Sequence, residues 1–119
     1  MLPQEKVQEN SFLKKVRQHI EDNFSNEQFQ IDDLASHLHL SRTQVYRKLK
    51  ALTGKTFTEM VKEMKIHRAK ELLLKTDKSV SEIAYELGFK DASYFSKVFK
   101  EVEGSSPTKY SLPNRNQET

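Results

Sequence analysis

Two short stretches of the sequence repeat the same order of hydroxyl and cationic side chains. The first set is Thr43, Arg47 and Lys50, and the second is Ser93, Lys97 and Lys100. Hydroxyl and cationic groups donate hydrogen bonds to phosphate oxygens and to the acceptor edges of bases. The planar guanidinium of Arg47 suits two hydrogen bonds to guanine O6 and N7, whereas Lys97 offers a flexible point charge. These residue types and their spacing indicate contact with a nucleic acid.

The two stretches lie inside a longer internal repeat. Ile31–Leu40 aligns with Val80–Phe89, and after one inserted residue near Lys90 the match continues to Met60 and Tyr110. Apolar, acidic, small and basic positions correspond along both copies, as they do when one structural unit is repeated. We expect each copy to form a short helix, a tight turn and a second helix.

Residues at the ends of the expected helices support this division. Ser79 followed by Glu82 is a capping box that opens the first helix of the second copy, and Ser41 starts the second helix of the first copy. Gly88 follows the last apolar residue of its helix, and His39 takes the same place in the first copy. Both positions suit the left-handed backbone conformation that ends a helix.

The second helix of each copy has one apolar and one polar face when its residues are placed about 100° apart. The apolar face comprises Val45, Leu49 and Leu52 in the first copy and Phe95, Phe99 and Val102 in the second. The hydroxyl and cationic sets point the opposite way, with Tyr46 and Ser96 beside them. A helix that only packs needs no repeated outward pattern. This arrangement is typical of a helix-turn-helix whose second helix enters the DNA major groove.

Two further helices complete the expected fold. Apolar residues recur at every fourth position from Phe12 to Phe24, which predicts a packing helix over 11–23, and those from Phe57 to Leu73 predict a long helix over 56–75. The sequence thus predicts an all-α fold in which two helix-turn-helix subdomains are joined by a long linker helix and preceded by an N-terminal packing helix. The expected divisions are an N-terminal segment with the packing helix (1–30), the first helix-turn-helix (31–55), the linker helix (56–78), the second helix-turn-helix (79–110) and a flexible tail (111–119).

Composition excludes several other classes of protein. The chain has no cysteine for a disulfide or a thiolate site, and its three glycines and three prolines are too few for a β-sandwich or a glycine-rich nucleotide loop. No apolar run is long enough for a transmembrane helix and no signal-peptide core follows Met1, so we expect a cytoplasmic protein. His37 and His39 do not share a helical face, so we expect no metal site. Because no catalytic motif is visible, we expect neither an enzyme nor a cofactor.

The positive charge is concentrated in one part of the chain. The net charge is +3, yet 34–58 contains basic residues and no acidic one. This distribution suits a polyanion, although a solvated lysine-rich surface or a helical module that binds an acidic protein would show it too. A reader of single-stranded RNA is disfavoured because the outward faces lack paired aromatic platforms. A steep loss of affinity as salt rises distinguishes DNA binding from the protein-interaction alternative.

Several motifs resemble the DNA-binding domain of the AraC/XylS family. They include Leu40-Ser41-Arg42, Ala69-Lys70-Glu71-Leu72-Leu73, Gly88-Phe89 and Ser93-Tyr94-Phe95-Ser96-Lys97-Val98-Phe99-Lys100. The resemblance covers 31–110, and with the helix before it the chain looks most like the C-terminal output domain of a hybrid two-component regulator. The resemblance implies sequence-specific binding to double-stranded promoter DNA, usually to activate transcription with RNA polymerase. Dimerisation would then depend on other parts of a longer parent chain.

The resemblance also implies which residues read bases. These positions fall on Thr43, Tyr46, Arg47, Ala92, Ser93, Ser96 and Lys97. From the residues themselves, the expected phosphate contacts are Ser41, Arg42, Lys50, Lys55 and Lys100, together with the exposed amides that open the two second helices. Lys97 stands where the family commonly has arginine, and Ala92 has no donor. We therefore expect the first copy to dominate base readout.

Overall fold

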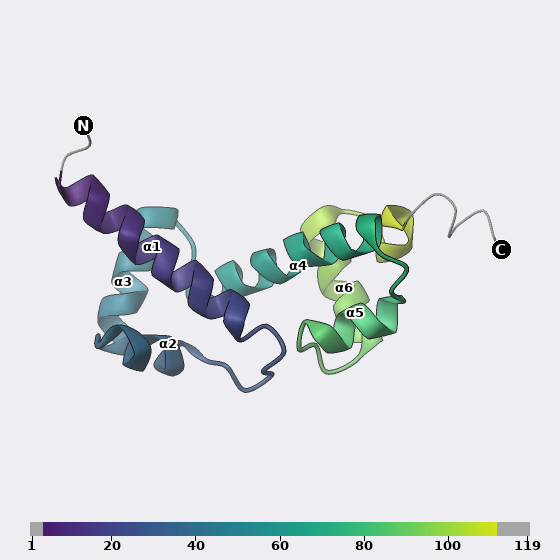
Figure 1. Cartoon of the computed structure of the whole chain (residues 1–119), viewed down its shortest axis with the longest axis horizontal. Helices are drawn as coiled ribbons and strands as arrows, with labels where there is room; N and C mark the ends of the chain where they lie inside the picture. Colours follow the sequence, from purple (N-terminus) through teal and green to yellow (C-terminus); the bar gives the residue numbers. More distant parts are fainter. Residues whose placement is uncertain (1–3, 112–119) are drawn as a thin grey trace. The chain divides into compact units, whose positions relative to one another are not determined.

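The computed structural model describes residues 4–111, with side chains from residue 10 onward, and this part of the chain is all-α, as predicted (Figure 1). Its elements are α1 (Gln4–Asp22), α2 (Ile31–Leu38), α3 (Arg42–Thr53), α4 (Phe57–Lys75), α5 (Val80–Glu86), α6 (Ala92–Glu103) and a short 3-10 helix, η1 (Pro107–Tyr110). They form two compact units. The N-terminal unit runs to Asn23 and includes Gln28–Val61, and the C-terminal unit comprises Phe24–Glu27 and the chain from Lys62 onward.

The N-terminal unit is built on the apolar stripe of α1. Val16 and Ile20 of this stripe are fully buried with Leu34 of α2 and with Val45 and Leu49 of α3. The helix begins at Gln4, whereas the sequence predicted a start at residue 11. The residues before the stripe are mostly good helix formers, so they extend the helix without adding an apolar position that periodicity could detect.

Local hydrogen bonds at the helix ends of the N-terminal unit confirm the predicted caps. Ser41 Oγ accepts from the Gln44 amide at 3.1 Å, and Gln44 Oε1 accepts from the Ser41 amide at 2.8 Å. His39 adopts the left-handed conformation with φ of 56°. Thr56 and Glu59 form a further reciprocal cap at the start of α4, with both bonds at 3.2 Å. The turn chemistry therefore defines where each helix begins and ends.

The C-terminal unit packs α5 and α6 against the later part of α4. Ile66, Leu73, Ile83, Phe95 and Phe99 are fully buried there. Ring centroids of Phe95 and Phe99 lie 5.9 Å apart, and the Phe99 ring meets Tyr110 of η1 at 5.3 Å. The internal repeat thus gives two helix-turn-helix units with different core residues at equivalent positions.

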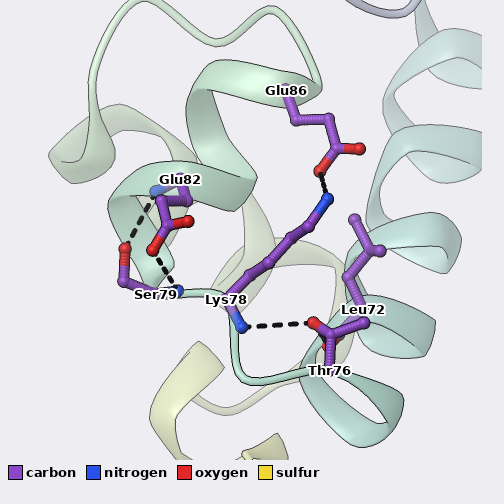
Figure 2. A network of polar contacts seen from close by, with 6 residues as sticks. All are labelled: Leu72, Thr76, Lys78, Ser79, Glu82 and Glu86. Carbon is purple, nitrogen blue, oxygen red and sulfur yellow. Dashed lines mark hydrogen bonds and ion pairs between the residues drawn. The ribbon is translucent and has the colours of Figure 1, made fainter.

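A polar network connects the end of α4 to the start of α5 (Figure 2). Thr76 Oγ1 donates to the Leu72 carbonyl at 2.6 Å and accepts from the Lys78 amide at 3.3 Å. The predicted capping box is present, with Ser79 Oγ accepting from the Glu82 amide at 3.1 Å. Lys78 Nζ donates to Glu86 at 2.7 Å. These bonds satisfy the helix-terminal groups of the turn and define the start of α5.

One prediction about the C-terminal unit is wrong. Val102 was expected on the buried face of α6, but it is 36% exposed, and Val98 is buried in its place at 2% exposure. Val102 lies on the apolar face but in the last turn of α6, where the helix ends, whereas Val98 lies one turn earlier, beside Phe95. The flexible tail expected over 111–119 stays a prediction: Ser111 is 7% exposed, and 112–119 lie outside the described residues.

The segment Phe24–Glu27 packs on α4 and on the turn after α5. Phe24 is buried, and a Cβ added at Gly88 would lie 2.3 Å from the Phe24 carbonyl oxygen. Gly88 therefore has no room for a side chain, and its φ of 75° also favours glycine.

Lys65 of α4 lies in the same region. Its Nζ is 5.2 Å from the centre of the Phe89 ring. Burial lowers the pKa of Lys65, and the charge of Glu27 opposes the shift.

Replacing Gly88 should destabilise the protein more than replacing Gly104. Both glycines have positive φ, but the Cβ of an alanine at Gly104 would have no atom within 4 Å. Gly104→Ala should therefore lose only the cost of the left-handed backbone, about 1–3 kcal/mol. Gly88→Ala adds a backbone clash that costs a further ~1–3 kcal/mol. Urea denaturation followed by circular dichroism measures both, and equal losses would contradict the close approach of Phe24 to Gly88.

Stacked histidines connect α1 and α2. The His19 and His37 ring centroids lie 4.0 Å apart at 12°, and the Phe29 ring meets His19 at 5.4 Å. Burial lowers the pKa of His19, and the charge of His37 lowers it further, against the opposing effect of Asp22 and Asp33. The folded protein therefore takes up this proton at lower pH than the unfolded chain does.

The free energy of unfolding should consequently fall on mild acidification. This contribution is fully present above the ordinary histidine pKa of about 6.5 and is lost as pH falls through the lower pKa of the folded state. Urea midpoints measured at about pH 7.5 and pH 5.5 should differ less in His19→Gln than in the parent protein. His67→Gln, at an exposed residue of α4, is the matched control. An unchanged pH dependence in His19→Gln would contradict the assignment.

Candidate nucleic-acid interface

The exposed face of α3 contains all the base-reading candidates of the first copy. Thr43, Tyr46 and Arg47 are exposed, with Tyr46 at 47%, while Val45 and Leu49 on the opposite side have no exposed surface. The predicted orientation of the helix is therefore confirmed. No residue of 10–111 forms a hydrogen bond or ion pair with Arg47, so its guanidinium donors face solvent.

Arg42, at the start of the same helix, has a close anionic partner. Its Nε and Nη2 donate to the two carboxylate oxygens of Asp32 at 2.7 and 2.5 Å. The hydrogen bonds from Arg42 lower the pKa of Asp32, and those to Asp32 raise the pKa of Arg42. Because Asp32 lies ten positions earlier in the sequence, on α2, the spacing alone did not reveal this pair. The carboxylate offsets the charge that Arg42 would present to a phosphate.

The predicted phosphate contacts at the end of α3 also surround a carboxylate. Lys50 is exposed, and its Nζ donates to the Gly54 carbonyl at 3.2 Å. Backbone and side-chain bonds from Thr56 lower the pKa of Glu59, and the charges of Lys50 and Lys55 add to the effect. The Glu59 carboxylate accepts from the Thr56 amide and so lies on the cap of its own helix.

A further cation on α3 was missed in the sequence. Lys48 is exposed, and its Nζ lies 4.7 Å from the centre of the Phe12 ring on α1. Its position between Arg47 and Leu49 is neither fully outward nor fully buried, so helical spacing assigned it to neither face.

The second recognition helix, α6, presents a weaker version of the same face. Ser93, Lys97 and Lys100 are exposed as predicted, whereas Ala92 and Ser96 are half-buried. Asp91 caps the helix by accepting from the Tyr94 amide at 2.7 Å. A carboxylate at a helix N-terminus offsets the positive end of the dipole, so the start of α6 is less suited to a phosphate than the start of α3.

Tyr94 is an exposed aromatic residue that the sequence interpretation did not single out. It is 46% exposed, beside Ser93 on α6, and its ring lies 6.1 Å from that of Phe89. The corresponding residue of the first copy is Gln44, whose side chain bonds to its own cap. The two faces therefore differ in shape as well as in charge.

An open groove of about 690 Å³ borders the exposed hydroxyl and cationic face of α3. Its walls come from the segment before α2, from α3 and from the start of α4. The lining residues are Phe29, Gln30, Ile31, Arg42, Thr43, Tyr46, Thr56, Phe57 and Thr58. Thr43 and Tyr46 thus belong both to the groove and to the predicted base-reading set.

The described residues show neither a cluster of metal-ligating side chains nor a helix that could cross a membrane. In that part of the chain, no group of three or more histidine, aspartate or glutamate side chains is placed to hold a metal ion. None of the described helices is long and apolar enough to cross a membrane.

Comparison with known proteins agrees with the geometry of the two units. Residues 34–112 match the helix-turn-helix domain family. Histidine kinase P4 of Formosa agariphila is 39% identical over 98 residues, which are 82% of this chain and 7% of the kinase. The chain therefore spans a small part of that relative's length.

Solved structures show the same fold. The C-terminal domain of the response regulator AraT from Geobacillus stearothermophilus has a TM-score of 0.76 at 31% identity, covering 83% of this chain and 82% of that one. The DNA-binding domain of the transcriptional factor AdpA, in complex with a target DNA, has a TM-score of 0.73 at 29% identity, covering 83% and 87%. With the family match over most of the chain, these similarities show that the protein belongs to the AraC-type helix-turn-helix family, the sequence-specific DNA-binding, non-catalytic domains of transcriptional regulators.

Proposed function

We propose that this chain is the DNA-binding output domain of a longer transcription regulator that binds promoter DNA in the bacterial cytoplasm. The supporting observation is the exposed hydroxyl and cationic face of α3, set opposite a fully buried apolar face and repeated in order on α6. Each unit would place its second helix in a major groove. The two helices would occupy successive grooves, about 34–36 Å apart along the duplex.

The residues of α3 would supply most of the base readout. Arg47 has free donors for guanine O6 and N7, a contact that discriminates by about 1–3 kcal/mol. Thr43 and Tyr46 offer hydroxyl groups and apolar surface for a thymine methyl. Lys50 and Lys55 would hold phosphates and set the position of the helix on the duplex.

The residues of α6 would add affinity more than sequence preference. Ser93 and Ser96 would contact bases directly or through water, and Ala92 would offer only close apolar approach. Lys97 would distinguish bases less strictly than Arg47, because its ammonium lacks the planar, bidentate donor geometry of a guanidinium. Lys100 would contact phosphate, while the carboxylate of Asp91 limits phosphate binding at the helix start.

Similarity to a histidine kinase and to a response regulator supports a place in a two-component system. In that setting, sensing and dimerisation would reside in other parts of the parent chain. Promoter binding would activate transcription through contact with RNA polymerase. Selection of binding sites from random duplexes, followed by footprinting, tests sequence-specific binding. Equal affinity for selected and random duplexes, with little salt dependence, would favour the helical protein-interaction module instead.

Arg47→Ala and Lys55→Ala should affect DNA binding in different ways. Arg47→Ala should weaken binding to the selected duplex by roughly 5- to 150-fold and relax preference at one base position, because a bidentate base contact is lost. Lys55→Ala should weaken selected and random duplexes by the same factor and reduce the salt slope by about 1, because a phosphate contact is lost. Titrations over a series of salt concentrations measure both effects. Equal losses on the two duplexes for Arg47→Ala would contradict its role.

Asp32→Asn should strengthen DNA binding without a large change in stability. Removing the carboxylate frees the charge of Arg42 for a phosphate, so affinity should rise on all duplexes and the salt slope should steepen by about 1. The pair is exposed, so the free energy of unfolding should change little. Glu21→Gln, an exposed residue of α1 in the same unit, makes the same change of charge away from α3. The same affinity gain in both variants would indicate a general charge effect rather than release of Arg42.

A further inference from the structure

The geometry points to a DNA contact beyond the recognition helices: the groove beside α3 seats one sugar–phosphate strand, and the Thr58 hydroxyl donates to a phosphate of that strand. This inference rests on the proposed function, because it needs α3 in the major groove. It extends the contact surface from α3 to the segment before α2 and to the first turn of α4. None of Thr58, Phe29 and Ile31 belongs to the contacts expected from the sequence.

The chemistry of the lining fits a sugar–phosphate strand. None of the nine lining residues is acidic, and the one cation among them, Arg42, is paired with Asp32. Phe57 is 7% exposed and its ring lies 5.5 Å from that of Phe29, so the two rings form an apolar floor. Deoxyribose presents apolar carbon atoms to such a floor, while its phosphates need donors at the edge. A large share of protein–DNA hydrogen bonds goes to phosphate and sugar, and threonine hydroxyls supply part of it.

Thr58 has the free donor that the inference requires. Its side chain is exposed, and no described residue of the chain makes a hydrogen bond to its hydroxyl. Its neighbour Thr56 is used differently, since Thr56 Oγ1 accepts from the Glu59 amide at 3.2 Å. The Glu59 carboxylate is bonded to the Thr56 amide at 3.2 Å and so does not line the groove.

The groove is continuous with the proposed DNA-reading face of α3. This continuity favours a DNA strand over a small ligand as the occupant. Thr43 and Tyr46 form one wall, so a duplex seated on α3 lies against the groove as well. A small ligand would need enclosure on most sides to bind well, whereas this groove is open. A strand of the duplex that α3 reads is therefore the occupant we infer.

The C-terminal unit has a related arrangement, but its threonine hydroxyl already has a partner. Thr108 aligns with Thr58 and is also exposed, and buried Pro107 takes the place of Phe57. However, the Thr108 hydroxyl lies 3.0 Å from that of Ser106, so the two hydroxyls already interact. The inference is accordingly made for Thr58 alone.

Single-phosphate substitution tests the contact directly. In a selected duplex, phosphates are replaced one at a time by neutral methylphosphonates, and binding of the parent protein is compared with Thr58→Val and Thr58→Ser. The valine variant has nearly the same shape without the hydroxyl, and the serine variant keeps the hydroxyl. Thr58→Val should bind both selected and random duplexes about tenfold more weakly, because one hydrogen bond to a charged group is lost.

The effect of each methylphosphonate on the three proteins identifies the phosphate that Thr58 contacts. One methylphosphonate should weaken the parent protein and Thr58→Ser but leave Thr58→Val unaffected, as expected for two groups that interact directly. Parent-like affinity of Thr58→Val at every phosphate would overturn the inference and leave the groove to another ligand. Failure of the proposed function has a different outcome, in which the parent protein shows no duplex preference and Arg47→Ala changes nothing. Matching thermal unfolding of the three proteins excludes loss of folding as the cause.

Discussion

Each recognition helix buries one apolar stripe, and this burial determines which side chains face solvent. Complete burial of Val45 and Leu49 fixes the rotation of α3 about its axis, and burial of Phe95 and Phe99 does the same for α6. Since helical geometry relates all residues of a helix by a fixed rotation, burying these positions turns the hydroxyl and cationic residues outward. The caps at Ser41 and Asp91 then set where each outward face begins. The candidate interface is thus a consequence of core packing rather than a separate feature.

Carboxylates lie next to several of the groups that we propose for contact with DNA. Asp32 pairs with Arg42, Glu59 folds back onto the cap of its helix, and Asp91 opens α6. Each acid lies close to a group that could otherwise hold a phosphate. Because phosphate contacts raise affinity for every DNA sequence alike, limiting them leaves a larger share of the binding free energy to contacts that distinguish bases. In the N-terminal unit, the free guanidinium of Arg47 is the group that we propose as the main such contact.

Much of the fold was predictable because it depends on local and periodic features. The all-α class, the paired caps and the left-handed residues at His39 and Gly88 follow from residues within a few positions of one another. Outward orientation of α3 was predictable for the same reason, and the exposure of Arg47 confirms it. Its contact with a base remains a prediction. The position of Val102 was mistaken because periodicity does not show where the partner surface of a helix ends.

By itself, the sequence determined the helices, their repeat and the faces on which the polar residues lie, because these depend on the rotation per residue and on nearby caps. Only the tertiary structure decided which distant groups come together. Arg42 bonds to Asp32, and Gly88 lies close to the Phe24 carbonyl. Thr58 and Tyr46 line the same groove. Such contacts depend on how helices and loops pack in three dimensions. Nothing in the spacing of the residues along the chain encodes those distances directly.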